Sequence, residues 1–188
     1  MAESVTERLG GKENILSWVA TIFVAIVMAL SIHGFVAEPF VVPTGSMLNT
    51  IQLGDRVLGE KLSYHFRTPQ PGEILMFNNP DGSDTILVKR VIATAGQTVD
   101  LRDGAVVVDG KVLDEPYVEG QPSYPIDHSL SGDGPLTYPY VVPEGHIWVM
   151  GDNRGVSLDS RYFGAVPLDS VVAHAVCTFW PLSNMRML

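Results

Sequence analysis

The chain has 188 residues, of which 46% are apolar and 18% charged, and its net charge at pH 7 is −9. This composition is typical of one globular domain with an accessory segment, and it excludes a disordered or low-complexity chain. The negative charge and the lack of any basic run exclude nucleic acid as a partner, because contacts to phosphates need a basic face. The single cysteine, Cys177, excludes an intrachain disulfide and lies in an apolar stretch, which indicates a buried structural thiol.

The first predicted element is a membrane-spanning helix over residues 15–36. The segment reads ILSWVATIFVAIVMALSIHGFV and contains no Asp, Glu, Lys or Arg. As a helix it is about 33 Å long at about 1.5 Å per residue, which is enough for a hydrocarbon core of about 30 Å. A cleaved signal peptide would have a shorter apolar region followed by small residues at a cleavage site. The pattern therefore predicts an uncleaved membrane anchor.

The basic residues beside this segment predict its orientation. Arg8 and Lys12 precede it, and the next basic residue in the chain is Arg56. Since basic residues stay preferentially on the cytoplasmic side, residues 1–14 are predicted to be a cytoplasmic tail. Residues 37–188 are then an extracytoplasmic domain of a single-pass protein in the cell membrane.

The extracytoplasmic domain is predicted to be mostly β. Strand-like segments such as DTILVKRVIAT and SVVAHAVCTFW alternate with turns rich in Gly, Pro, Asp and Asn. We expect an antiparallel, barrel-like sheet with a smaller inserted β region over residues 99–142, where DGAVVVDGK predicts a short strand between two tight turns. Residues 121–140 are rich in Pro, Gly and Ser and predict a long surface loop, whose role the sequence leaves open.

Two kinds of side chain could activate a nucleophilic serine in this domain. The five histidines show no metal-binding spacing, and the G-x-S-x-G signature is absent, yet a Ser–His–Asp triad stays an alternative. A lysine can serve instead if burial keeps it neutral. In TILVKRVI, period-two alternation places Lys89 on one strand face with Leu87 and Val91. Both a buried lysine and a solvent-facing lysine at a strand edge fit this segment.

Two further stretches hold polar side chains at turns. PTGSM, residues 43–47, follows closely on the predicted helix and contains one serine. GDNRGVSLDSR, residues 151–161, brings two acids, two arginines and two serines directly after the apolar strand HIWVM. By composition alone this second stretch is equally a charged loop held by an Asp–Arg bridge.

The combination is more specific than its parts. PTGSM after an apolar segment, then VKRVIATAGQTVDLRDG, then GDNRGVSLDSRYFGAVP resembles the type I signal peptidases, the bacterial leader peptidases. The resemblance implies a membrane-anchored serine endopeptidase that removes signal peptides from exported preproteins by a Ser–Lys dyad. It implies no metal or organic cofactor, and it implies the lipid bilayer and the secretion translocon as partners.

The resemblance also implies a role for each matching residue. Ser46 would be the nucleophile and Lys89 its general base. The Ser46 backbone N–H and the Thr44 hydroxyl would form the oxyanion hole. Ser157 would orient the lysine, and the other supporting residues would be Asp159, Arg161, Gly151, Asp152, Asn153 and Met47.

Three positions depart from the family pattern. Asn49 replaces a typical proline, Leu87 replaces a frequent aromatic residue, and residues 94–97 replace a frequent Leu-Pro-Gly-Asp. These departures leave the substrate preference open, as the sequence also leaves open the cognate preproteins and the oligomeric state. Two other functions fit the chain: a specialised Ser–Lys peptidase that matures one precursor, and a non-catalytic membrane-anchored β domain.

Overall fold

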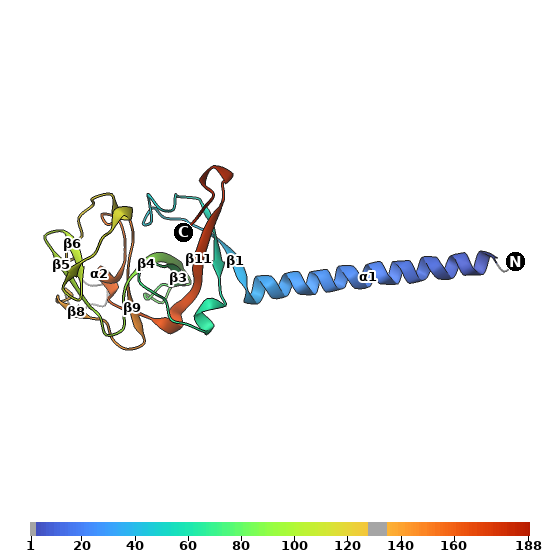
Figure 1. The fold of residues 1–188 in the computed structure, drawn as a ribbon, viewed down its shortest axis with the longest axis horizontal. Helices are drawn as coiled ribbons and strands as arrows, with labels where there is room; N and C mark the ends of the chain where they lie inside the picture. Colours follow the sequence, from blue (N-terminus) through green and yellow to red (C-terminus); the bar gives the residue numbers. More distant parts are fainter. Residues whose placement is uncertain (1–2, 128–134) are drawn as a thin grey trace. The chain divides into compact units, whose positions relative to one another are not determined.

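The computed structural model describes residues 3–127 and 135–188, and within the first helix it describes the side chains of residues 15–31 and 34. The chain divides into two units, Met1–Ala37 and Glu38–Leu188. Figure 1 shows the first unit as one long helix, α1 (Glu3–Phe35). Over the described residues, no helix combines the length and the apolar character needed to cross a membrane. The structure thus contains a helix at the predicted position but does not support the predicted membrane crossing.

A large antiparallel sheet forms the framework of the second unit. In the described residues its strand order is β1–β2–β11–β3–β4–β9–β10, and β12 pairs with β11. This arrangement confirms the predicted mostly β, antiparallel fold. The strands are β1 (Ala37–Val41), β2 (Arg56–Glu60), β3 (Ile74–Asn78), β4 (Ile86–Thr94), β9 (His146–Met150), β10 (Val166–Pro167), β11 (Val171–Trp180) and β12 (Arg186–Met187).

A small sheet is inserted in the sequence between β4 and β9. It consists of β5 (Thr98–Arg102), β6 (Ala105–Val108), β7 (Lys111–Val112) and β8 (Tyr140–Val141), in the order β7–β6–β5–β8. Asp-Gly pairs with positive φ join β5 to β6 and β6 to β7, as expected for tight hairpin turns. The predicted strand between two turns is therefore confirmed, whereas residues 128–134 of the predicted long loop lie outside the described residues.

The remaining elements of the second unit are short. They are η1 (Ser63–His65), η2 (Pro116–Val118), α2 (Ser160–Phe163), η3 (Leu168–Ser170) and η4 (Leu182–Asn184). These short helical turns connect the strands and leave the two sheets as the main source of buried surface.

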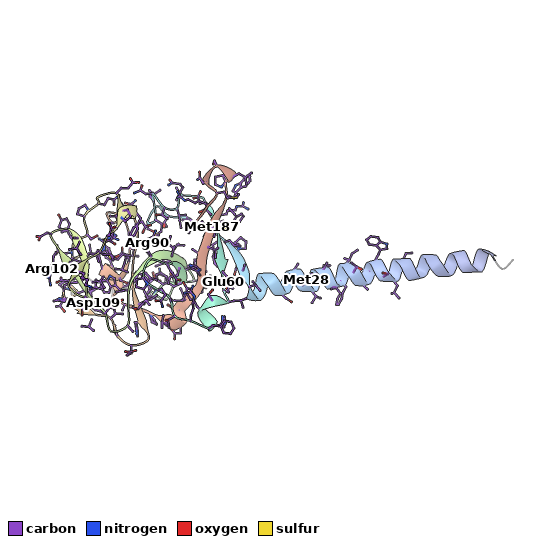
Figure 2. All side chains as sticks on the ribbon, viewed as in Figure 1. Met28, Glu60, Arg90, Arg102, Asp109 and Met187 are labelled. Carbon is purple, nitrogen blue, oxygen red and sulfur yellow. The ribbon has the colours of Figure 1, made fainter. Side chains whose placement is uncertain are left out.

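Apolar side chains from both sheets fill the interior of the second unit; Figure 2 draws the side chains of the described residues. One cluster contains Met47 and Ile51 of the segment after β1, together with Val88 of β4. Another joins Trp148 of β9 to Val99 of the small sheet. Because each fully buried apolar side chain contributes about 1.5–3 kcal/mol, these clusters hold the segment after β1 and the strand β4 firmly in place.

Candidate active site

Ser46 and Lys89 lie side by side, although they are 43 positions apart in the sequence. Lys89 Nζ donates a hydrogen bond to Ser46 Oγ at 2.7 Å and another to the backbone oxygen of Val88 at 3.1 Å. Both side chains are buried, Lys89 with only 2% of its surface exposed. A serine hydroxyl in direct contact with an amine can lose its proton to that amine when the amine is neutral.

Lys89 lies in β4, between β3 and β9 rather than at the edge of the sheet. It pairs with Leu75, which is fully buried. Burial lowers the pKa of Lys89 to about 8, although the carboxylates of Asp159 and Asp152 act in the opposite direction. The alternative of a solvent-facing lysine is therefore wrong, and a substantial share of Lys89 is neutral near pH 8.

The turn that carries Ser46 is held from two sides. Met47 is fully buried in the apolar core, and its backbone oxygen accepts a hydrogen bond from Ile51 N at 2.7 Å. On the other side, Asn153 donates from its backbone N–H to Ser46 O at 3.0 Å and from Nδ2 to Gly45 O at 3.0 Å. The predicted supporting residues Met47 and Asn153 thus both contact this turn.

The backbone conformation at Asn49 explains why this chain lacks the proline that is typical of the family at this position. Its φ is 80°, whereas the ring of proline restricts φ to about −65°. The turn of this chain could not therefore hold proline at that position in the conformation that it adopts. Arg186 of β12 supports the same turn by donating from Nη2 to Asn49 O at 3.1 Å.

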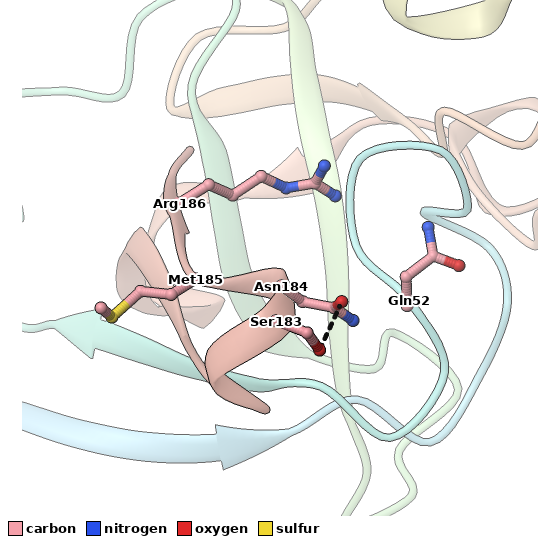
Figure 3. Close-up of a pocket in the computed structure, with 5 residues that line it drawn as sticks. All are labelled: Gln52, Ser183, Asn184, Met185 and Arg186. Atoms are coloured by element: carbon pink, nitrogen blue, oxygen red, sulfur yellow. Dashed lines mark hydrogen bonds between the residues drawn. The ribbon is translucent and has the colours of Figure 1, made fainter.

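A polar pocket of about 310 Å³ lies beside this support (Figure 3). It is lined by Gln52, Ser183, Asn184, Met185 and Arg186. Ser183 Oγ donates to Asn184 Oδ1 at 3.2 Å, and Asn184 Nδ2 donates to Asp55 Oδ1 at 2.8 Å. No lining residue is an acid or a base that titrates near neutral pH, so these residues cannot transfer protons there. Their hydrogen bonds instead support the turn that carries Ser46.

Thr44 lies at the mouth of a second, more apolar pocket. Its hydroxyl oxygen is 3.4 Å from Ser46 Oγ. The pocket has a volume of about 250 Å³ and is lined by Val42, Pro43, Thr44, Ser46, Thr85, Ile86, Leu87 and Val88. The pocket lies directly beside Ser46. The oxyanion role of Thr44 stays a prediction.

Two ion pairs shape the stretch 151–161: one lies within the stretch, and the other ties it to β4. Arg161 contacts both oxygens of Asp159, from Nε at 2.9 Å and from Nη2 at 3.0 Å. Arg90 does the same to Asp152, at 2.9 Å and 2.7 Å. Asp159 Oδ2 also accepts from Gly151 N at 3.1 Å. Such two-point contacts between Arg and carboxylate are strong and directional, so they determine the path of this turn.

Gly151 lies where the turn leaves no room for a side chain. A Cβ atom there would be 2.2 Å from Ser157 Oγ and 2.5 Å from Ser46 O. The Ser157 hydroxyl is buried and has no hydrogen-bond partner among the described residues. Lys89 donates to Ser46 and Val88 instead, so the expected bond from Ser157 to the lysine is not present and its orienting role stays a prediction.

Several residues at this site were not predicted from the sequence. Arg90 and Thr50 both donate to the Asp152 carboxylate, and Arg154 forms a buried ion pair with Glu115. Arg90 follows Lys89 directly, so alternation along the strand predicts only that the two side chains lie on opposite faces of the sheet. It does not predict the partner of Arg90. Pairing between such distant residues has no signal in a single sequence.

The histidine alternative finds no support in the described part of the chain. His65 Nδ1 contacts Lys61 O, His146 Nδ1 contacts Glu144 O, and the His174 ring packs against Tyr64. His128 lies outside the described residues. Residues 3–127 and 135–188 also contain no group of acidic, histidine or cysteine side chains that could hold a metal ion.

Comparison with known proteins gives consistent matches over most of the chain. The family model described as signal peptidase, peptidase S26, matches residues 15–180. A probable signal peptidase I-1 of Synechocystis sp. is 41% identical over 185 residues, which cover 94% of this chain and 86% of that protein. A signal peptidase I of Leptolyngbya laminosa is 35% identical and covers 93% and 84%. The thylakoidal processing peptidase 1 of Arabidopsis thaliana is 33% identical and covers 87% and 48%.

Proposed function

Because this chain belongs to the S26 family of signal peptidases, we propose that it is a serine endopeptidase that cleaves signal peptides from exported preproteins. The observation that carries the proposal is the 2.7 Å contact between Lys89 Nζ and Ser46 Oγ in a buried setting. The names of its relatives support the same substrate class.

In the proposed reaction, Ser46 Oγ attacks the scissile carbonyl carbon while Lys89 takes the hydroxyl proton. The oxyanion that forms is stabilised by the Ser46 backbone N–H and the Thr44 hydroxyl. Lys89 then delivers its proton to the leaving amine, which breaks the peptide bond and leaves an acyl ester on Ser46. A water molecule then gives a proton to Lys89 and attacks the ester carbonyl. As the bond from the acyl carbon to Ser46 Oγ breaks, Lys89 returns this proton to Oγ, which restores the serine and the neutral lysine.

The apolar pocket beside Ser46 supports binding of an apolar side chain close to the cut. The preference for small residues there is proposed from the resemblance to the signal peptidases. A substrate bound in extended form directs alternate side chains toward the enzyme. We propose that it lies along the edge strand near residues 39–44, with small residues, mainly alanine, at the first and third positions before the cut. Replacing these alanines with bulky residues should prevent cleavage, and unchanged cleavage would contradict the proposed mode of binding.

Membrane attachment is proposed from the sequence of residues 15–36. This stretch has many exposed apolar side chains, among them Ile15, Trp18 and Phe23. Together with Arg8 and Lys12 on the preceding side, they favour a lipid anchor with the catalytic unit outside the cytoplasm. Protease added to spheroplasts should degrade residues 37–188, and their protection would contradict this orientation. Contact with the secretion translocon stays a prediction.

The test of the function is cleavage of a preprotein by the detergent-solubilised full chain. Wild type should release the mature protein with its native N-terminus, and Ser46→Ala should not. Cleavage of several unrelated precursors would argue against a peptidase dedicated to one substrate. An inert wild-type protein that is folded would instead favour a non-catalytic β domain.

A further inference from the structure

Residues 115–123, which we call the bridging segment, lie in the sequence between β7 and β8 of the small sheet and contact the stretch 151–154. Glu115 begins this segment, and its carboxylate contacts both terminal nitrogens of Arg154, at 3.0 Å and 2.5 Å. Ser123, at the other end, accepts from the same guanidinium at 2.5 Å. The side chains of Arg154 and Glu115 are 1% and 8% exposed. The bridging segment therefore holds a fully buried arginine from both of its ends.

Arg154 connects the bridging segment to Gly151 and Arg161 at the candidate active site. Its Nε donates to Gly151 O at 2.9 Å, and its backbone oxygen accepts from Arg161 Nη2 at 2.7 Å. Gly151 is the residue at which even a Cβ atom would meet Ser46 O at 2.5 Å. A displacement of residue 151 toward the serine turn must therefore push on the Ser46 backbone, because no empty space separates them.

Tyr117 gives the bridging segment a second contact with the site. Its ring lies over the guanidinium of Arg90, with 4.0 Å from Cζ to the ring centre, and its hydroxyl donates to Glu115 Oε1 at 3.0 Å. Arg90 holds both oxygens of Asp152. The segment thus acts on two consecutive residues, Gly151 through one arginine and Asp152 through another.

We infer that Glu115 and Tyr117 are positioning residues for the Ser46–Lys89 pair, through which the small sheet takes part in the reaction. They touch neither reacting atom and act through Arg154 and Arg90. The measurement of kcat and KM depends on the proposed function, whereas the titration of Lys89 does not. Removing the Glu115 charge leaves a buried guanidinium without its carboxylate, which should let the stretch 151–154 shift and admit water.

The charged groups that act on Lys89 give the direction of a second readout. Asp152 and Asp159 are the carboxylates near it, each paired with its own arginine, Arg90 or Arg161. Burial is the largest influence on this lysine, so added water should raise its titration midpoint toward that of free lysine. Loss of an acidic neighbour would act in the opposite direction but is the smaller influence.

The experiment compares Glu115→Gln with wild type and with Glu119→Gln, an exposed glutamate in the same segment. Detergent-solubilised full chains are assayed for kcat and KM on a preprotein at a temperature where each variant is folded. The titration of Lys89 is followed in the same chains by NMR of ¹³C-labelled lysine, assigned with Lys89→Arg, and needs no substrate. For Glu115→Gln we expect kcat to fall about tenfold with KM within about twofold, since small misplacements of reacting groups cost this much or more. We also expect its Lys89 midpoint to rise, and Glu119→Gln to match wild type.

Each outcome bears on the inference separately from the function. If wild type cleaves preproteins and Glu115→Gln has the same kcat and the same Lys89 midpoint, Glu115 is not a positioning residue. If wild type cleaves nothing but the Lys89 midpoint moves in Glu115→Gln, the proposed function fails and the inference stands. If Glu115→Gln does not fold, Tyr117→Phe decides, because it removes only the hydroxyl that contacts Glu115. An unchanged kcat and Lys89 midpoint in that variant would overturn the inference.

Discussion

The motif Asp-x-Arg forms an internal ion pair in the small sheet, at residues 100–102, and another at the candidate active site, at residues 159–161. The surroundings of these two pairs differ. Asp100 and Arg102 of β5 form an ion pair with exposed fractions of 12% and 60%. Asp159 and Arg161 form one in which these fractions are 0% and 3%. Arg102 has a single contact to Asp100, whereas Arg161 holds both carboxylate oxygens of Asp159. Burial, rather than the local motif, therefore decides what such a pair does.

The two regions differ in the same way in their other charged groups. Around Asp159, the buried side chains of Lys89, Asp152 and Arg154 also carry charge. On the small sheet, labelled side chains such as Arg102 and Asp109 lie at the outside of the unit (Figure 2). Charges in water interact weakly, while charges in a protein interior depend strongly on their partners. Substitutions should therefore have large effects in the first region and small effects in the second.

The largest effect is expected at the proposed reacting pair. Ser46→Ala and Lys89→Ala should each lower kcat/KM by about 1,000-fold or more, and the double variant should be little worse, because groups that act together are not additive. The measurement is preprotein cleavage, with circular dichroism to show that each variant is folded. Full activity of Lys89→Ala would return the choice of base to a histidine.

The two Asp-x-Arg pairs allow a matched comparison of stability. Asp159→Asn should lower the free energy of unfolding by about 3–5 kcal/mol, because it leaves the buried Arg161 charge without a partner. Asp100→Asn should lower it by no more than about 1 kcal/mol, because solvent screens that pair. Urea unfolding followed by fluorescence measures both. Equal losses in the two variants would remove the distinction between the regions.

Gly151 and Gly155 lie in the same turn but differ in the space available for a side chain. Gly151→Ala places a Cβ atom against Ser157 and Ser46 and should lower kcat/KM by about 100-fold, since displacements of about 1 Å have effects of that size. At Gly155 a Cβ atom would meet nothing within 4 Å, so Gly155→Ala should keep wild-type activity. Cleavage assays on the two purified variants test this, and an active Gly151→Ala enzyme would show that the turn can relax.

The smallest effect is a gradual dependence on pH. Lys89 must be neutral to accept the Ser46 proton, and burial lowers its pKa to about 8. The free enzyme's kcat/KM should therefore fall about tenfold per unit as pH drops below about 8, and level off above it. A pH profile of kcat/KM measures this directly. A fall that begins only near pH 6.5, the usual range of histidine, would contradict the assignment of Lys89 as base.

The sequence predicts the parts of the site that follow from local pattern. Alternation in TILVKRVI allows a buried Lys89, and the turn residues around Ser46 mark the loop that carries it. It does not predict the contact between Glu115 and Arg154, because the two residues are 39 positions apart and either one alone reads as a surface charge. The positive φ of Asn49 is likewise a property of the folded turn.

The predicted membrane anchor shows a different limit of prediction from sequence. Uncharged apolar residues predict a helix, and α1 is helical over Glu3–Phe35. The predicted crossing also needs a bilayer around that helix, which is a property of the surroundings and not of the fold. For residues 15–36, the structure therefore tests the predicted helix, and an experiment with a membrane is needed to test the predicted crossing.

The lack of space at Gly151 has an evolutionary consequence. Any single substitution there adds a Cβ atom, which would clash with Oγ and Cβ of Ser157 and with the backbone oxygen of Ser46. No change of side chain elsewhere can remove that backbone oxygen. Trimming Ser157 to glycine would relieve only the clashes with Ser157. No second-site substitution of a side chain therefore opens a neutral path away from glycine, and lineages that keep this catalytic geometry should keep glycine at this position.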